Sequence, residues 1–111
     1  MITIAVVFPL LLLLAAVLAE LASSGKLKRN WIAGIRTSQT RESDAAWVAG
    51  HRAARKALWI GFAASAVAGM LALVTQDAVS ITFTVVVVVA LVATVATSLV
   101  QANRASTAVT A

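Results

Sequence analysis

Three long stretches of this chain contain no charged residue, and this feature constrains the fold more than any other. They run from Met1 to Ala19, from Ala57 to Gln76 and from Ala78 to Asn103. A helix rises about 1.5 Å per residue, so about 20 apolar residues cross a hydrocarbon layer about 30 Å thick. Only helices or closed barrels satisfy their backbone hydrogen bonds in lipid, and the alternating pattern of a barrel is absent. The sequence therefore predicts an all-α integral membrane protein with three transmembrane helices.

The composition supports this interpretation, because 61% of the residues are hydrophobic and only 12% are charged. We place the spans at residues 1–22, 57–76 and 79–102, with a flexible cytoplasmic tail at 103–111. The first stretch also has features of a cleaved signal peptide, with a small-residue cleavage site near Ala19. We favour a retained helix, because no basic residue precedes the stretch and because it exceeds the usual signal core of about 7–15 residues.

The basic residues predict the orientation. Eight of the nine Lys and Arg residues lie between the first and second spans, and the ninth, Arg104, follows the third. The connection between the second and third spans contains Asp77 and no basic residue. Short loops rich in Lys and Arg remain in the cytoplasm. We therefore expect the N-terminus to lie outside and the C-terminus to lie in the cytoplasm.

Several functional classes find no support in the sequence. The chain has no cysteine, which excludes disulfides and cysteine-based metal sites. Its net charge of +5 arises from residues that flank the spans, so we expect no nucleic-acid partner. Recognisable hydrolase, metalloprotease and phosphate-binding motifs are absent, and no ionisable residue lies in the middle of a span. We predict a protein that is neither an enzyme nor a transporter and that has no cofactor or metal site.

Residues 23–56 form a polar insert, which we predict to be a structured basic cytoplasmic loop followed by an amphipathic helix. Trp31 is suited to the level of the lipid headgroups. The helix is expected to start near Arg41, with Thr40 or Ser43 as its N-cap, and to continue without a break into the second span. A helical period places five residues on one face, namely Asp44, Trp47, His51, Arg55 and Leu58. Arg41, Arg52 and Lys56 lie on the adjacent side of this helix.

A second face of the same helix consists of small residues. It includes Gly50 and Ala54 and continues into the membrane as Gly61, Ser65 and Gly69, at steps of four residues. This spacing allows helix backbones to approach closely in lipid. We favour packing within the chain for this face, and a homo-oligomer interface is the alternative.

The insert resembles the SdpI family, a group of bacterial membrane proteins named for immunity against a secreted, membrane-active peptide toxin. The resemblance covers about residues 30–61 and depends on a spaced set of residues: Asn30, then Gly34, Ile35, Arg36 and Thr37, then Thr40, Trp47 and His51. Two departures affect the loop. Ser38 and Gln39 replace a Pro and an aromatic residue found in many members, and the gap after Asn30 is one residue longer than expected.

The resemblance implies a multi-pass protein of the bacterial plasma membrane that confers immunity or tolerance toward a membrane-active peptide toxin by binding. We expect Arg36 to pair with Asp44 and Trp47 to cover this pair. The alternative for each of these residues is a purely structural role: packing for Trp47, hydrogen bonding for His51, and fixing of the membrane topology for the basic residues. Two other functions remain open: a sensor or scaffold that recruits a soluble regulator through this loop, and an accessory subunit of a larger membrane complex.

Overall fold

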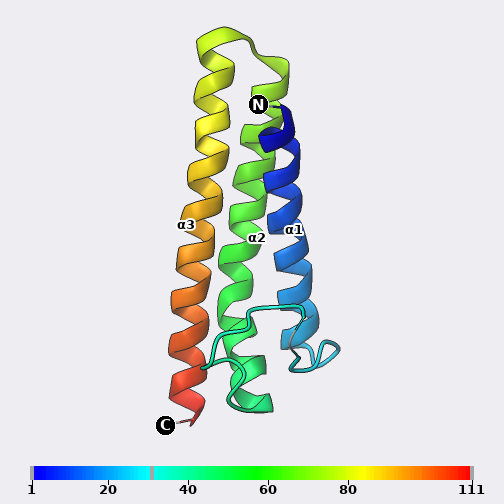
Figure 1. Cartoon of the computed structure of the whole chain (residues 1–111), viewed down its shortest axis with the longest axis vertical. Helices are drawn as coiled ribbons and strands as arrows, with labels where there is room; N and C mark the ends of the chain where they lie inside the picture. The colour runs from blue at the N-terminus through cyan, green and yellow to red at the C-terminus, as the bar shows by residue number, and fades with distance from the viewer. Residues whose placement is uncertain (1, 31, 111) are drawn as a thin grey trace.

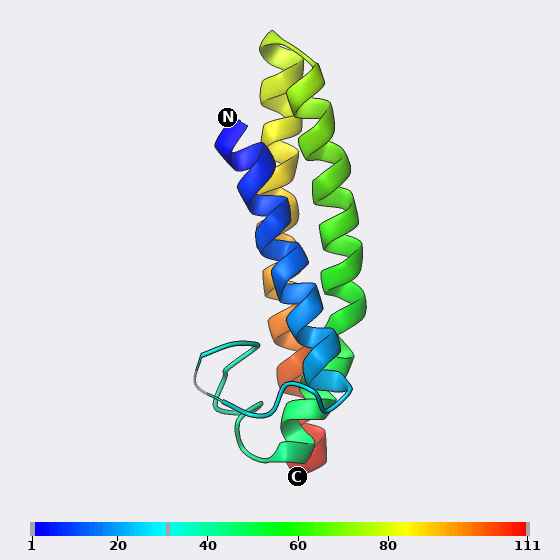
Figure 2. The same ribbon diagram turned by 90° about the vertical axis from the view of Figure 1, so that its right-hand side faces the viewer.

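The computed structural model describes residues 2–30 and 32–110, which fold into a bundle of three long helices (Figure 1). Helix α1 comprises Ile2–Ser23, α2 comprises Asp44–Val74 and α3 comprises Asp77–Thr110. Helices α2 and α3 form a hairpin, and α2 packs against both α1 and α3 (Figures 1 and 2). Each helix is long and apolar enough to cross a membrane. The structure therefore agrees with the predicted all-α fold with three candidate spans.

The helix boundaries follow from local capping. After α1, Gly25 adopts a left-handed conformation (φ +84°), and the backbone N–H groups of Lys26 and Leu27 both donate to the carbonyl of Leu21. At the start of α2, the Ser43 side chain accepts a hydrogen bond from the N–H of Ala46 at 3.0 Å. These contacts satisfy backbone groups that the helix itself leaves unpaired.

The helix expected before the second span continues into it without a break, as predicted, because both belong to α2, which runs from Asp44 to Val74. The predicted start near Arg41 is three residues too early. The reason is that Thr40 forms hydrogen bonds within the preceding loop, whereas Ser43 acts as the N-cap.

The flexible tail expected at residues 103–111 is helical as far as Thr110, the end of α3. This part of α3 packs against α2: Ser106 is fully buried, and its hydroxyl donates to the carbonyl of Ala46 at 2.8 Å. The prediction was wrong because the composition of the tail gave no indication of this tertiary contact.

Small residues make up most of the interior of the bundle, and many large apolar side chains lie on its surface. A Cβ atom on Gly61 would collide with the Thr94 side chain of α3, and one on Gly69 would collide with the backbone of Ala5 in α1. Ser65 lies between these two glycines on α2 and is fully buried. Exposed Leu, Val and Ile side chains cover the outside, as expected for helices surrounded by lipid.

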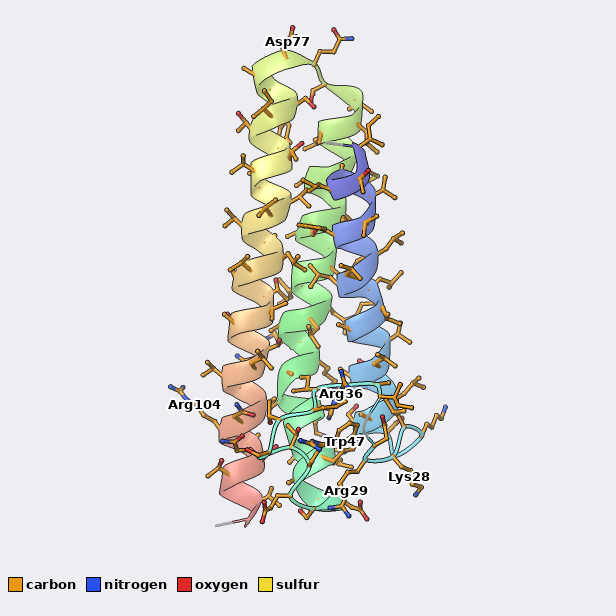
Figure 3. All side chains as sticks on the ribbon, in the orientation of Figure 1. Lys28, Arg29, Arg36, Trp47, Asp77 and Arg104 are labelled. Atoms are coloured by element: carbon orange, nitrogen blue, oxygen red, sulfur yellow. The ribbon has the colours of Figure 1, made fainter. Side chains whose placement is uncertain are left out.

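The charged residues are divided between the two ends of the bundle (Figure 3). Lys28, Arg29, Arg36 and Arg104 lie toward one end, and Asp77 lies at the other. We call the first of these the basic end. The bundle is 51 Å long, which exceeds a hydrocarbon layer of about 30 Å. Part of the bundle therefore extends beyond the hydrocarbon layer, and the basic residues can lie at the surface of the membrane.

Candidate functional site

We call the segment between α1 and α2, residues 24–43, the basic loop. It holds the motif residues from Asn30 to Thr40. It extends to one side of the bundle and returns to the start of α2 (Figure 2). Asn30 shapes the part of the loop that follows, because its Oδ1 accepts hydrogen bonds from the N–H groups of Ile32 and Ala33, each at 2.8 Å. The neighbouring Trp31, which we placed at headgroup level, lies outside the described residues.

Gly34 allows the basic loop to pass directly over α2. Its φ angle is +97°, a backbone conformation that residues other than glycine rarely adopt. A Cβ atom at this position would lie 2.8 Å from Nε2 of His51 and 3.0 Å from the ring of Trp47. Trp47 is 1% exposed, and its Nε1 donates to the carbonyl of Leu27 at 2.9 Å. The loop thus contacts the indole at two separate points.

His51 connects the basic loop to α2 through both of its ring nitrogens. Its Nε2 accepts a hydrogen bond from the N–H of Ile35 at 2.8 Å, so Nδ1 must hold the proton that is donated to the carbonyl of Trp47, also at 2.8 Å. The imidazole is fully buried and packs against the Trp47 ring, with centroids 4.2 Å apart. Burial lowers the pKa of His51 below its ordinary value of 6.5, although the hydrogen bond to Trp47 opposes this shift. The neutral form therefore holds the loop.

We expect the attachment of the basic loop to weaken in acid. Because the pKa of His51 is lower in the folded state, its stabilising contribution is fully present above pH 6.5 and is lost as the pH falls through the folded-state pKa. Protonation also removes the acceptor for the N–H of Ile35. Hydrogen exchange of the Ile35 amide, corrected for its intrinsic pH dependence, should show protection that decreases below pH 6.5.

The variant His51→Asn is the control for this effect, because it has no titratable group at position 51. Its Ile35 protection should not vary with pH over the same range. If wild type and variant show the same pH dependence, the acid sensitivity arises elsewhere in the protein.

Two threonines close the second half of the basic loop. The Thr40 hydroxyl is fully buried and donates to the carbonyl of Ile35 at 2.7 Å, while accepting from the N–H of Thr37 at 3.0 Å. The Thr37 hydroxyl donates to Oδ1 of Asn103 on α3 at 2.6 Å. The sequence does not single out Asn103, since nothing in its local pattern separates it from the rest of the predicted tail.

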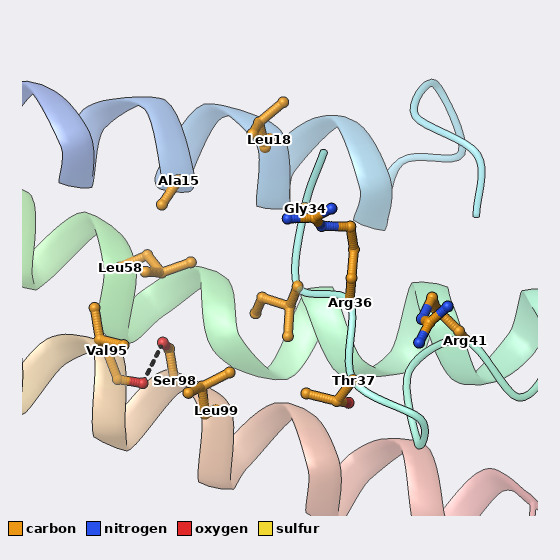
Figure 4. A pocket seen from close by; sticks show the side chains of 11 residues that line it. Ala15, Leu18, Gly34, Arg36, Thr37, Arg41, Leu58, Val95, Ser98 and Leu99 are labelled. Atoms are coloured by element: carbon orange, nitrogen blue, oxygen red, sulfur yellow. Dashed lines mark hydrogen bonds between the residues drawn. The ribbon is translucent and has the colours of Figure 1, made fainter. Parts of the chain in front are cut away.

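Arg36 differs from the other motif residues in where its side chain lies. It is exposed, and its guanidinium is directed toward α1 at the edge of a cavity of about 560 Å³ (Figure 4). Arg41 also lines this cavity, whereas the sequence predicts it on the helix beside Arg52 and Lys56. The apolar part of the cavity comes from all three helices, through Ala15, Leu18, Leu58, Val95 and Leu99.

The ion pairs near the basic end differ from the expected arrangement. Asp44 pairs with Arg29 at 3.4 Å, whereas we expected Arg36 in that position. Glu20, at the end of α1, lies 3.6 Å from Arg55 of α2 and accepts a hydrogen bond from Nε1 of Trp59 at 3.0 Å. Both acidic residues therefore connect parts of the bundle.

Comparison with protein families matches residues 26–97 to the SdpI/YfhL protein family. The match covers more than half of the chain and includes nearly all of the basic loop, the whole of α2 and the larger part of α3. It confirms the resemblance indicated by the motif between Asn30 and His51. No curated protein and no solved structure matches this chain.

Proposed function

This chain belongs to the SdpI/YfhL protein family, and on that premise we propose that it protects a bacterium against a membrane-active peptide toxin. It does so by binding, without catalysing a reaction. The observation that supports this role is the position of Arg36. Other motif side chains, among them Thr37, Trp47 and His51, hold the basic loop on the bundle through hydrogen bonds. The loop thereby presents Arg36 beside a cavity between the helices.

The guanidinium of Arg36 suits a binding role at this position. It offers five donors in a planar fork, which recognises carboxylates and backbone carbonyls with a geometry that lysine cannot reproduce. A peptide that inserts into the bilayer presents such groups where it crosses the headgroup region. We propose that the basic loop and the neighbouring helices intercept the peptide at this level of the plasma membrane.

We predict that Arg36→Lys removes most of the protection while the protein remains in the membrane at its normal level. A lost charge-assisted hydrogen bond weakens binding by about tenfold or more. A strain lacking the gene is complemented with either form and exposed to a panel of secreted membrane-active peptides, and survival and membrane potential are recorded.

The matched control is Arg104→Lys, because Arg104 is an exposed arginine of α3 that does not line the cavity. It should protect as well as wild type. Full protection by Arg36→Lys at normal abundance would contradict the proposal and favour a role for this charge in membrane topology alone.

The proposed site requires the basic end to face the cytoplasm. We predict that a reporter active only in the cytoplasm works when fused after the last residue, and that one active only in the periplasm works when inserted beside Asp77. All nine basic residues then lie inside, as the positive-inside rule requires. Periplasmic activity from the C-terminal fusion would overturn this orientation.

A further inference from the structure

We propose that the cavity beside Arg36 is a binding site for the headgroup of an anionic phospholipid. Two guanidinium groups, those of Arg36 and Arg41, line it, and the hydroxyl-bearing Thr37 and Ser98 add polar atoms. The rest of its wall is apolar and includes Leu58 of α2. An anionic phospholipid combines the same two properties, since its headgroup is negatively charged and its acyl chains are apolar.

The charge of the cavity selects an anionic ligand. Among the residues that the structure describes, no acidic side chain lines the cavity. Two of the four acidic residues of the chain, Glu20 and Asp44, form ion pairs with Arg55 and Arg29, which are not part of its wall. Arginine binds phosphate oxygens with two parallel hydrogen bonds, which explains its frequent use at phosphate sites.

The cavity is also open to the surrounding lipid. Its α3 wall includes Val95 and Leu99, whose side chains are 41% and 37% exposed on the surface of a helix that can span the membrane. Its α1 wall is formed by Ala15 and Leu18, in the half of α1 that leads to the basic end. An acyl chain can therefore remain in the bilayer while the headgroup reaches Arg36.

The size and position of the cavity agree with a headgroup. A volume of about 560 Å³ lies within the range of about 300–1,000 Å³ that is typical of small-molecule sites. It is large enough for the phosphate and the glycerol region but leaves the long acyl chains outside. Basic pockets between transmembrane helices on the cytoplasmic side are a known means of binding anionic lipid headgroups.

The test uses the full-length protein purified in a neutral detergent, with lipid retention measured by native mass spectrometry. The probes are dioleoylphosphatidylglycerol, which has a net negative charge, and dioleoylphosphatidylcholine, which has none. We expect the wild-type protein to retain the first lipid preferentially. Arg36→Gln and Arg41→Gln should each weaken its retention by about tenfold, and Arg104→Gln, with the same change in charge, should have no effect.

A second pair of variants tests the apolar part of the site while both arginines are kept. Val95→Phe places a larger side chain in the cavity wall, whereas Val89→Phe makes the same change at a lipid-facing position of α3 that does not line the cavity. Only Val95→Phe should reduce retention of phosphatidylglycerol. Circular dichroism of each variant verifies that the bundle remains folded.

The proposal is overturned if phosphatidylcholine is retained equally, or if the Arg36 and Arg104 variants behave alike. Displacement of the lipid by millimolar inorganic phosphate alone would identify a simple anion site and would also contradict it. The inference does not depend on the role in toxin protection. A protein that retains no lipid but still protects cells would refute the lipid site and leave the proposed function intact.

Discussion

Gly61→Leu is expected to separate α2 from α3 and to lower the free energy of unfolding more than Gly61→Ala or Ala63→Leu. Even a single Cβ atom at this position would collide with three atoms of the Thr94 side chain. Helices in lipid associate through close van der Waals packing, so a bulky residue at the closest approach removes that contact. Overpacking costs about 1–3 kcal/mol and occasionally more, and we expect a loss of about 3 kcal/mol in the free energy of unfolding.

Unfolding in mixed micelles with an increasing fraction of denaturing detergent, followed by circular dichroism, measures this loss. Ala63→Leu is the matched control, because Ala63 lies two residues away on α2 and is exposed. Its effect should stay within about 0.5 kcal/mol, as is usual for surface substitutions. Equal unfolding transitions for the two leucine variants would show that the approach of α2 to α3 at Gly61 has no special packing role.

A milder substitution identifies the partner of Gly61. Gly61→Ala introduces only the Cβ atom, and a second change, Thr94→Ala, removes two of the three atoms with which it would collide. The double variant should therefore recover part of the stability that Gly61→Ala loses. A double-mutant cycle with no coupling between the two positions would place the cost elsewhere.

Gly34→Ala is the second change for which we expect a large effect, and its target is the basic loop. The left-handed conformation costs an L-residue about 1–2 kcal/mol. The added Cβ atom would also lie 2.8 Å from Nε2 of His51 and 3.0 Å from the ring of Trp47. Such crowding costs a further amount of about 1–3 kcal/mol. Together these effects predict a loss of about 2–5 kcal/mol and release of the loop from α2.

Gly25→Ala separates the two contributions. Gly25 also has a positive φ angle, +84°, but no atom of the described residues lies within 4 Å of the position that its Cβ would occupy. This variant should lose only the conformational part, and the Ile35 amide should remain protected from hydrogen exchange. If the two alanine variants lose the same stability and the same protection at Ile35, the contact of Gly34 with Trp47 and His51 does not hold the loop.

The three helices and the position of the charge could be predicted from the sequence, because both depend on local composition. A stretch of about 20 uncharged apolar residues can satisfy its backbone in lipid only as a helix or a closed barrel. The helical period also placed Trp47 and His51 on one face of α2, and both are buried in the structure. The spacing of the motif residues was sufficient to identify the family.

The partners of those residues could not be predicted in the same way. His51 binds the backbone of Ile35, and Trp47 binds that of Leu27, across gaps of 16 and 20 residues. Every residue has the same backbone groups, so the sequence cannot indicate which of them His51 and Trp47 bind. The same reason explains the error at the C-terminal end, where the buried hydroxyl of Ser106 donates to the carbonyl of Ala46.

The sequence by itself thus determined that the chain forms membrane-spanning helices with a basic end, since hydropathy and charge act on each segment separately. The tertiary structure decided how the basic loop folds back onto α2 and α3 and where Arg36 and Arg41 lie. The cavity beside them is built from three helices and the loop, and its residues range from Ala15 to Leu99. Such a site exists only when segments distant in sequence pack together, because its shape and charge belong to their arrangement and to none of them alone.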